Sequence, residues 1–250
     1  MRHLFSRTSD GTLAGLMQRK PLLGFDFDGT LAPLVELPSM ARLEPGTSAR
    51  LARLAAALPV VIISGRAVRD LAPRLEGISL AGISGNHGLE PWGATPEVEH
   101  LVAGWADLLA QRFGQVPGLE IENKRWSLTV DYRHVPDLSS TEKALAAFAK
   151  TLPQVRVLGG RHADLNLAPA GEHHKGTALA SHVAALGRDA ALYVGDDRTD
   201  EDAFAHPIDG LVSVRVGLKA GSRAQFFLQE QAEVDRLLDA LLALAGSGSR

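Results

Sequence analysis

The sequence predicts an α/β protein: a parallel sheet flanked by helices, with a smaller α+β domain inserted between its two halves. Towards both ends of the chain, short apolar runs alternate with helical patterns, which favours parallel strands joined by right-handed crossovers. In the middle, the order changes to helix, strand, strand, twice over, which suits a small antiparallel sheet. The length of 250 residues also fits a core that carries a sizeable insertion.

The first part of the core contains predicted strands separated by helices. Residues 22–27 and 59–63 are apolar runs typical of buried strands, and residues 79–84 form a weaker strand. The first of these runs ends in carboxylates, and the second is rich in β-branched residues. Leucines at helical spacing predict a helix over residues 45–58, and a further helix passes through residues 68–71.

The inserted domain begins after the weaker strand. Its predicted elements are a helix over 98–113, strands at 119–123 and 127–132, a helix over 141–150, and strands at 155–158 and 164–168. Ser139 or Ser140 is expected to cap the second helix, because a serine hydroxyl accepts hydrogen bonds from the free N–H groups there. We place this domain at residues 89–168, and the discontinuous core at residues 1–88 and 169–250.

The alternation of strands and helices returns in the last part of the chain. A helix is predicted over residues 175–186, followed by strands at 191–194 and 211–216. An amphipathic helix over residues 234–244 closes the fold. Together with the first part of the chain, these elements complete one parallel sheet.

Composition and charge exclude several classes of protein. Lys and Arg number 26 and Asp and Glu number 29, and this net charge of −3 argues against general nucleic-acid binding. The absence of cysteine excludes disulfides, zinc thiolates and cysteine nucleophiles, and fits a cytoplasmic protein. No apolar run is long enough to cross a bilayer and no signal peptide is evident, so we expect no membrane partner. We expect a monomer that acts on a small molecule.

Four polar motifs follow predicted strands or begin predicted helices, where open α/β sheets bind their ligands. They are Asp26-Phe27-Asp28-Gly29-Thr30, Ser64, Lys175-Gly176-Thr177 and Gly195-Asp196-Asp197-Arg198-Thr199-Asp200-Glu201-Asp202. Carboxylates as close as those of Asp26 and Asp28 repel each other unless a cation or a proton lies between them. Hard oxygen ligands in this number favour Mg²⁺ over zinc, while Ser64 and Lys175 suit the oxygens of a phosphate.

Each motif taken alone has a simpler interpretation. Asp26-Phe27-Asp28 alone is typical of a solvated turn, and Ser64 with Gly65 is typical of a structural pair. Lys175 alone is typical of a surface lysine, and the acidic run from Gly195 is typical of a helix start, where the helix dipole favours carboxylates. Their joint order at the strand ends of one sheet favours a common site for phosphate and metal instead.

Together the four motifs resemble those of the haloacid-dehalogenase superfamily of aspartyl phosphatases, over nearly the whole chain. More narrowly, five segments resemble the trehalose-6-phosphate phosphatase family. They are Ile63-Ser64-Gly65-Arg66, Gly85-Asn86-His87-Gly88, Glu122-Asn123-Lys124, Asp131-Tyr132-Arg133 and the acidic run from Gly195. The resemblance implies a Rossmann-like core and a cap domain, formed by the insertion, that closes over the substrate.

The resemblance also implies a role for each residue of the core motifs. Asp26 would be the nucleophile that forms an aspartyl-phosphate. Asp28 would act as general acid for the leaving sugar and then as general base for water. Ser64 and Lys175 would hold the phosphoryl oxygens, and Asp200 would orient Lys175 or a metal-bound water.

For the metal and the sugar, the resemblance implies two further sets of residues. Mg²⁺ would bind the carboxylates of Asp26 and Asp196 and the main-chain carbonyl of Asp28, with Asp197 nearby in the same loop. The implied substrate-binding residues are Thr30, Gly65, Arg66, Asn86, His87, Glu122, Lys124 and Arg133.

The implied function is magnesium-dependent hydrolysis of trehalose 6-phosphate to trehalose and phosphate, a step of trehalose biosynthesis. Two departures from the family pattern leave the sugar open, since the family usually has His where Asp131 stands and Glu near Asn166. Asp131 lies on the same strand face as Arg133, which places the two to form an ion pair. A phosphatase of another sugar phosphate is therefore an alternative. A phospho-accepting receiver is disfavoured because receivers have no inserted cap, and a non-catalytic sensor because every motif residue is retained.

Overall fold

The structure is a computed structural model that describes residues 1–158 and 163–247. Residues 159–162, within the predicted insertion, and residues 248–250, at the end of the predicted core, lie outside the described residues. Within the described ranges, no helix is both long enough and apolar enough to span a membrane.

Most of the chain forms a layered α/β unit, which we call the larger unit. Its strands and helices are β1 (Arg2–His3), α1 (Thr12–Gln18), β2 (Leu22–Phe25), α2 (Pro45–Ala57), β3 (Val60–Ile63), α3 (Val68–Leu71), β4 (Gly82–Ser84), α6 (Lys175–Ala185), β9 (Ala191–Gly195), α7 (Glu201–Phe204), β10 (Leu211–Val216), β11 (Phe226–Leu228) and α8 (Glu233–Ser247). Short 3₁₀ helices occur at Arg7–Ser9, Pro38–Met40, Ala72–Leu75 and Asn86–Gly88.

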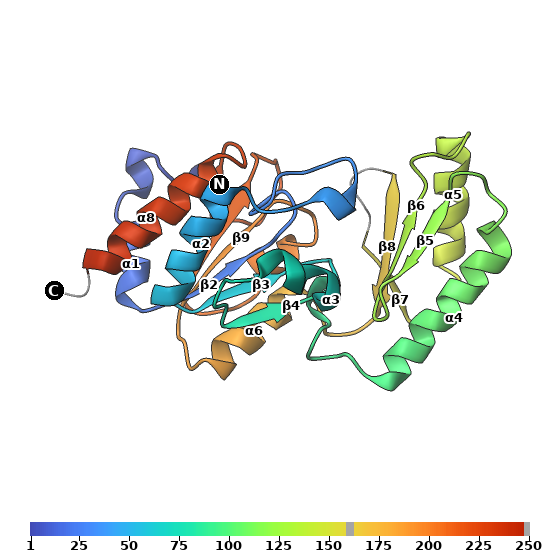
Figure 1. Ribbon diagram of the computed structural model, residues 1–250, viewed down its shortest axis with the longest axis horizontal. Coiled ribbons are helices and arrows are strands. Elements are labelled where there is room, and N and C mark those ends of the chain that lie inside the picture. Colours follow the sequence, from blue (N-terminus) through green and yellow to red (C-terminus); the bar gives the residue numbers. More distant parts are fainter. Residues whose placement is uncertain (159–162, 248–250) are drawn as a thin grey trace.

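The strands of the larger unit form one seven-stranded sheet in the order β1-β11-β10-β9-β2-β3-β4. Every pairing in it is parallel, which confirms the predicted fold class. Helices α1, α2 and α8 pack on one face of the sheet, and α6 packs on the other (Figure 1). The short helix α7 packs on the same face as α6. Because both faces are covered, β2, β3 and β9 are buried along their whole length, which explains their continuous apolar sequences.

Several elements of the larger unit were not predicted from the sequence. The edge strands β1 and β11 contain 2 and 3 residues, and helix α7 contains 4. Elements this short carry too little periodicity to identify, and their structure depends on the neighbours with which they pair. The 7-residue helix α1 was also missed.

Residues 96–158 and 163–169 form a second, smaller α+β unit, shown at the right of Figure 1. Its elements are α4 (Pro96–Phe113), β5 (Glu120–Asn123), β6 (Leu128–Asp131), α5 (Leu138–Ala149), β7 (Val155–Val157) and β8 (Asp164–Pro169). The strands form an antiparallel four-stranded sheet in the order β5-β6-β8-β7, as the repeated helix, strand, strand pattern predicts. Helices α4 and α5 pack against this sheet and share a hydrophobic core with it.

The start of α5 corrects one prediction. The cap is Asp137, whose carboxylate accepts a hydrogen bond from the N–H of Ser140 at 3.0 Å, and not Ser139 or Ser140. The helix begins at Leu138, so both serines lie inside its first turn, where their own N–H groups need a cap. An aspartate caps a helix as well as a serine does, and here it stands at the right position.

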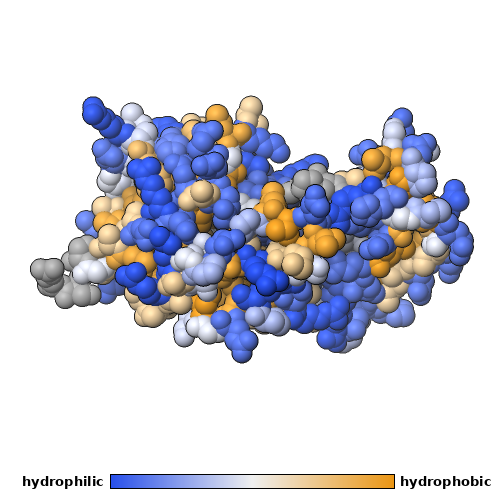
Figure 2. Space-filling model, turned by 45° about the horizontal axis from the view of Figure 1, so that its top comes forward, coloured by the Kyte–Doolittle hydropathy of each residue, from blue (hydrophilic) through white to orange (hydrophobic). Residues whose placement is uncertain are grey.

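An open cleft of about 560 Å³ lies between the two units. This volume is in the range typical of small-molecule sites. Figure 2 shows the surface dipping between the two lobes of the molecule. In β6, Leu128 and Val130 point into the core of the smaller unit, while the alternate residues Thr129 and Asp131 line the cleft. The polar face of the smaller sheet therefore faces the carboxyl ends of the larger one.

Candidate active site

The strand ends of the larger sheet bring three polar residues together. Asp26 follows β2, Ser64 follows β3 and Asp196 follows β9, and these strands are neighbours in the order β9-β2-β3. Because the three strands are parallel, their carboxyl ends meet at one edge of the sheet. The N–H of Asp26 donates to the carbonyl of Val194 at 2.9 Å, so the sheet ladder continues to the residue that carries the first carboxylate.

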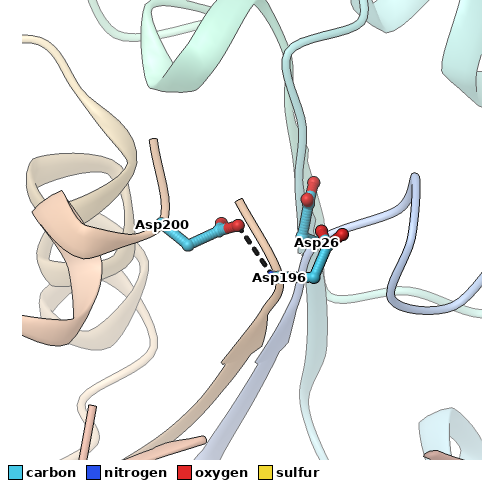
Figure 3. Close-up of side chains that lie close together, drawn as sticks. All are labelled: Asp26, Asp196 and Asp200. Carbon is cyan, nitrogen blue, oxygen red and sulfur yellow. Dashed lines mark hydrogen bonds between the residues drawn. The ribbon is translucent and has the colours of Figure 1, made fainter. Parts of the chain in front are cut away.

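Asp26, Asp196 and Asp200 form a group of carboxylates with oxygens within 4.8 Å of one another. Figure 3 shows Asp26 and Asp196 side by side at their strand ends. Asp200 lies to their left in this view, and its carboxylate points toward them. Burial raises the pKa of Asp26 well above its ordinary value; Lys175 opposes this rise and the neighbouring carboxylates add to it. A divalent cation would relieve this repulsion, and carboxylate oxygens are ligands that Mg²⁺ prefers, so the donor set fits this metal.

Asp200 is fully buried, and its acceptor positions are used by the protein itself. Its Oδ1 accepts hydrogen bonds from Lys175 Nζ at 2.8 Å and from the Tyr193 hydroxyl at 2.7 Å. Its Oδ2 accepts from the N–H groups of Asp196 at 3.0 Å and Asp197 at 2.8 Å. A carboxylate has about four acceptor positions, so this one is suited to fix the loop and Lys175 rather than to bind a cation.

The loop that carries Asp196 is also fixed from β10. Arg215 Nη1 donates to the carbonyl of Asp197 at 3.0 Å and to Glu201 Oε1 at 2.9 Å, while its Nη2 donates to the carbonyl of Asp196. Gly195 leaves the room that this arrangement requires, because a Cβ there would lie 2.2 Å from Asp200 Cγ. The loop is therefore held rigidly at the strand end.

Lys175 lies between two carboxylates, with its Nζ 3.0 Å from Asp26 Oδ1 and 2.8 Å from Asp200 Oδ1. Its side chain is only 2% exposed. Burial alone lowers the pKa of Lys175, but the two carboxylates outweigh burial and the net shift is upward. The lysine is therefore a fixed cation beside Asp26, where it can bind an anion that approaches that carboxylate.

His174 caps the helix α6 that begins with Lys175. Its Nδ1 accepts hydrogen bonds from the N–H groups of Gly176 at 3.1 Å and Thr177 at 3.3 Å. In return, the Thr177 hydroxyl accepts from the N–H of His174 at 3.0 Å, which completes a capping box. Burial lowers the pKa of His174 and so favours the neutral ring that an acceptor at Nδ1 requires.

The substitution His174→Ala should lower the free energy of unfolding by about 1 kcal/mol, because it removes the cap of α6. It should also lower turnover, since the cap fixes the residue next to Lys175. His174→Asn should keep most of both, because asparagine is among the best capping residues. Chemical denaturation and phosphate-release assays check this, and equal stability of the two variants would contradict the assigned role.

Asp28 and Arg66 form a bidentate ion pair at the floor of the cleft. Arg66 Nε and Nη2 each lie 2.7 Å from one carboxylate oxygen of Asp28. Arg66 Nη1 donates to Asp70 Oδ2 at 2.7 Å, and Asp70 in turn binds Arg74 at 2.8 Å. This network of ion pairs fixes the guanidinium of Arg66 against the carboxylate of Asp28. The resemblance implies that this carboxylate is the general acid and base.

Ser64 and His87 approach the same floor from β3 and from the turn after β4. Ser64 is buried, and its carbonyl accepts from the N–H of His87 at 2.9 Å. The His87 ring lies against Gly65, where a Cβ would come within 2.5 Å of it. Burial and nearby lysine cations lower the pKa of His87 well below its ordinary value, so the ring is neutral. Its Nδ1 is buried and has no hydrogen-bond partner among the residues that the structure describes.

The smaller unit contributes charged residues to the opposite wall of the cleft. Lys124 Nζ lies 3.8 Å from Glu122 Oε2; burial lowers the pKa of Lys124, and Glu122 opposes that shift. Arg133 Nε lies 3.0 and 2.9 Å from the two carboxylate oxygens of Asp131, so the ion pair predicted from the sequence is confirmed. Arg133 Nη1 also donates to the main-chain carbonyl of Glu36 in the larger unit, at 2.6 Å.

The cleft brings most of the predicted site residues together. Those that line it are Asp26, Asp28, Ser64, Gly65, Arg66, His87, Glu122, Lys124, Arg133 and Lys175. Asp196 and Asp200 join them through the carboxylate group around Asp26.

Thr30 and Asn86 are not among the residues that line the cleft, so their positions do not support the predicted contact with substrate. The Thr30 hydroxyl donates to Asp196 Oδ1 at 3.4 Å. The Asn86 amide donates to Glu90 at 2.6 Å and accepts from the Ser127 hydroxyl at 2.5 Å, which links the two units. Both residues support the site from outside the cleft.

Some residues of the cleft were not identified from the sequence. Thr129 and Asp164 line it, as do the apolar residues of the loop after β2. The alternation along residues 127–132 could have indicated Thr129, because it shares a strand face with Asp131. Nothing in the sequence pattern indicates that the loop after β2 reaches the smaller unit.

Comparison with known proteins places this geometry in a family. The family model described as trehalose-phosphatase matches residues 24–232. A trehalose-phosphate phosphatase of Mycobacterium avium is 35% identical over 216 residues, which cover 80% of this chain and 54% of that protein. A second trehalose-phosphate phosphatase, from Mycobacterium tuberculosis, is 36% identical over 211 residues, or 78% of this chain and 53% of its own length. The chain thus spans about half the length of these curated relatives.

Solved structures agree with the match. The C-terminal domain of Candida albicans trehalose-6-phosphate phosphatase superimposes with a TM-score of 0.76 at 25% identity, covering 94% of this chain and 95% of that one. A haloacid dehalogenase-like hydrolase from Bacteroides thetaiotaomicron shares the fold with a TM-score of 0.65 at 17% identity, over 88% of this chain and 99% of its own. With its fold, its strand-end carboxylates and these matches, the chain belongs to the trehalose-phosphatase family and has the haloacid-dehalogenase fold.

Proposed function

We propose that the protein hydrolyses trehalose 6-phosphate to trehalose and inorganic phosphate. The observation that carries this proposal is the shared cleft. The buried carboxylate of Asp26 and the buried ammonium of Lys175 lie on one side of it, and a polar wall from the smaller unit lies on the other. A phosphate at Asp26 would therefore have its sugar against the hydrogen-bonding groups of the smaller sheet. The names of the relatives support the same substrate.

The reaction begins at Asp26. A carboxylate oxygen of Asp26 attacks phosphorus, the bond from phosphorus to the sugar oxygen breaks, and an aspartyl-phosphate forms. Water then attacks phosphorus, the bond to Asp26 breaks, and inorganic phosphate leaves with the carboxylate restored. Lys175 and the hydroxyl of Ser64 would bind the phosphoryl oxygens, and the neutral ring of His87 can donate a further hydrogen bond to them.

Asp28 would carry the proton in both steps. As an acid it gives its proton to the leaving sugar oxygen, and as a carboxylate it takes one from the attacking water. Arg66 occupies one acceptor position on each of its oxygens in this structure, so the remaining positions are the ones that would give or take the proton. The phosphate dianion of an incoming substrate is a competing partner for the guanidinium.

The metal site would be formed by the carboxylates of Asp26 and Asp196 and by the main-chain carbonyl of Asp28. Bound there, Mg²⁺ would neutralise negative charge on the nucleophile and the phosphoryl group. Asp200, whose acceptor positions are used by Lys175, Tyr193 and two N–H groups, would fix Lys175 and the loop.

The smaller unit would act as a cap domain, with the chain divided into a core at residues 1–88 and 169–250 and a cap at residues 89–168. Glu122, Lys124 and Arg133 would then bind sugar hydroxyls or the phosphate. A cytoplasmic location, a monomeric state and a place in trehalose biosynthesis remain predictions.

A second candidate is hydrolysis of another sugar phosphate. It is favoured by Asn166, which stands near the position where the family usually has Glu. Asn166 lines the cleft, accepts from the Thr129 hydroxyl at 2.6 Å and donates to Asp164 at 2.8 Å. An amide fixed in this way offers a different hydrogen-bond pattern to a sugar than a carboxylate does.

Substrate preference decides between the two candidates. The ratio kcat/KM for trehalose 6-phosphate should exceed that for glucose 6-phosphate and other monosaccharide phosphates by at least about a hundredfold, since a second sugar ring can contact the cap wall. A higher value for a monosaccharide phosphate would support the alternative. No release from any sugar phosphate would contradict both.

The substitutions Glu122→Gln and Lys124→Met should reduce kcat/KM for trehalose 6-phosphate by about 10- to 100-fold, because each removes a charged hydrogen-bonding group from the cap wall. Glu122→Gln should change the hydrolysis of a small aryl phosphate by less than about threefold, since this substrate has no sugar to bind. An equal loss on both substrates in Lys124→Met would assign Lys124 to the phosphate instead. Steady-state kinetics with both substrates check this, and equal losses on both in Glu122→Gln would contradict its assigned sugar contact.

A further inference from the structure

Residues 33–41, between β2 and α2, form a loop at the edge of the cleft, which we call the core loop. Leu34, Val35 and Leu37 of this loop line the cleft with more than two fifths of their surface exposed. Figure 2 shows hydrophobic surface next to the dip between the two lobes. Since exposed apolar side chains do little to fix a loop, its position depends on its main-chain contacts.

Besides the adjacent Arg42, which donates to the carbonyl of Met40 at 3.3 Å, three arginines from distant parts of the sequence hold the core loop by its main-chain carbonyls. Arg66 Nη2 donates to Pro38 at 2.8 Å, and Arg74 Nη1 donates to Ser39 at 3.1 Å and to Ala41 at 2.6 Å. Both of these arginines belong to the larger unit. The third arginine, Arg133, donates to Glu36 at 2.6 Å and comes from the smaller unit. The bond from Arg133 therefore joins the two walls of the cleft.

Other contacts between the units have a different place. Arg69 Nη2 of α3 donates to the main-chain carbonyl of Asn123 at 3.2 Å, in the same hairpin turn as Ser127. Asn86 binds Ser127 just before the chain enters the smaller unit. Arg156 binds Asp202 at 2.5 Å, beside the segment by which the chain leaves it. Those contacts lie near the connections between the units, where the two parts are close in any case. The hydrogen bond from Arg133 to Glu36 spans the cleft, so it affects the separation between the two walls that would enclose a ligand.

Asp131 sets the direction of the Arg133 side chain. It binds Nε and Nη2 of the guanidinium as a fork and accepts from the N–H of Arg133 at 3.0 Å. The remaining nitrogen, Nη1, is thereby aimed at Glu36. A bidentate pair of this kind fixes the plane of a guanidinium more firmly than a single bond does.

Strand pairing places two further carboxylates beside Asp131, and their negative charge favours the ion pair of Asp131 with Arg133. Glu120 and Asp164 stand opposite Asp131 on the neighbouring strands, so three carboxylates share one row of the cleft wall. Like charges in such a row repel each other, and Arg133 compensates them. The Arg133 guanidinium holds the pKa of Asp131 below its ordinary value against the opposing effect of burial, so the pair is charged at neutral pH.

We propose that Asp131 is a positioning residue for substrate binding. It aims Arg133 at the carbonyl of Glu36, and this bond holds the core loop and the cap wall at the separation that encloses the sugar. The inference rests on the proposed function, because it concerns how the cleft binds a sugar phosphate. It gives a role to Asp131, where the sequence resemblance to the family implies His instead.

The test compares Asp131→Asn and Asp131→Glu with Glu120→Gln, which removes the same charge from the same row. In Asp131→Asn, KM for trehalose 6-phosphate should rise about tenfold while kcat stays within about twofold. The substitution disturbs the position of Arg133 and the core loop, which enclose the sugar, and leaves the reacting groups in place. Asp131→Glu should recover part of this loss, and Glu120→Gln should behave as wild type. Hydrolysis of a small aryl phosphate should not change in any of the three.

Hydrogen exchange gives a second readout that needs no substrate. Amides of residues 33–41 should exchange faster in Asp131→Asn than in wild type, and at the wild-type rate in Glu120→Gln. Unchanged exchange in Asp131→Asn, or equal effects of Asp131→Asn and Glu120→Gln on KM, would overturn the inference. A wild-type protein that does not hydrolyse trehalose 6-phosphate would overturn the proposed function instead, while the exchange rates would still decide the role of Asp131.

Discussion

Asp26→Asn should abolish hydrolysis of sugar phosphates, with a loss in kcat on the order of 10⁴ or more, because an amide cannot form the acyl phosphate. The fold should remain intact. Asp26 is buried among three other aspartates, so the neutral amide removes repulsion as well as the pairing with Lys175. Phosphate release and thermal unfolding measure the two effects separately.

The matched control for this variant is Asp200→Asn. Asp200 lies in the same carboxylate group but is not proposed to form a bond with phosphorus. Its substitution should lower kcat less than Asp26→Asn does, and it should destabilise the protein more, because four hydrogen bonds depend on its oxygens. Residual turnover in Asp26→Asn equal to that of Asp200→Asn would remove the nucleophile assignment.

Lys175→Met should have the second largest effect, and it should reduce both stability and turnover. The variant leaves the carboxylates of Asp26 and Asp200 buried without their shared cation, at a cost of about 3–5 kcal/mol in the free energy of unfolding. Turnover should fall by about 10²- to 10³-fold, because the phosphoryl oxygens lose a fixed positive charge. Denaturant titration and phosphate release check the two values.

A double variant separates the two roles of this lysine. Adding Asp200→Asn to Lys175→Met removes one of the uncompensated charges, so it should restore part of the lost stability. It should restore no turnover, since the cation is still missing from the phosphate site. A double variant that is no more stable than Lys175→Met would show that the buried charges do not determine stability here.

The sheet and the core site could be predicted from the sequence because their signals are local. A buried parallel strand is an apolar run, and the residue after it lies at the carboxyl edge of the sheet, so Asp26, Ser64 and Asp196 fall together once the strands are identified. The ion pair of Asp131 with Arg133 was predicted from strand alternation in the same way.

What could not be predicted depends on contacts between distant segments. Asn86 belongs to a motif that suggests substrate binding, yet its amide is used by Glu90 and Ser127. The core loop meets Arg133 across 97 positions of sequence, and no periodicity records such a contact. The bidentate hold of Arg66 on Asp28 is likewise visible only once both residues have been brought to the same cleft.

The central claim is that these residues form a metal-dependent phosphatase site for a phosphorylated disaccharide. The most direct test measures phosphate release from trehalose 6-phosphate by the wild-type protein, with Mg²⁺ present and after its removal by a chelator. We expect turnover with Mg²⁺, a loss of at least about a hundredfold on chelation, and recovery when Mg²⁺ is added back. The absence of phosphate release with Mg²⁺ present, or release at the same rate after chelation, would contradict the account.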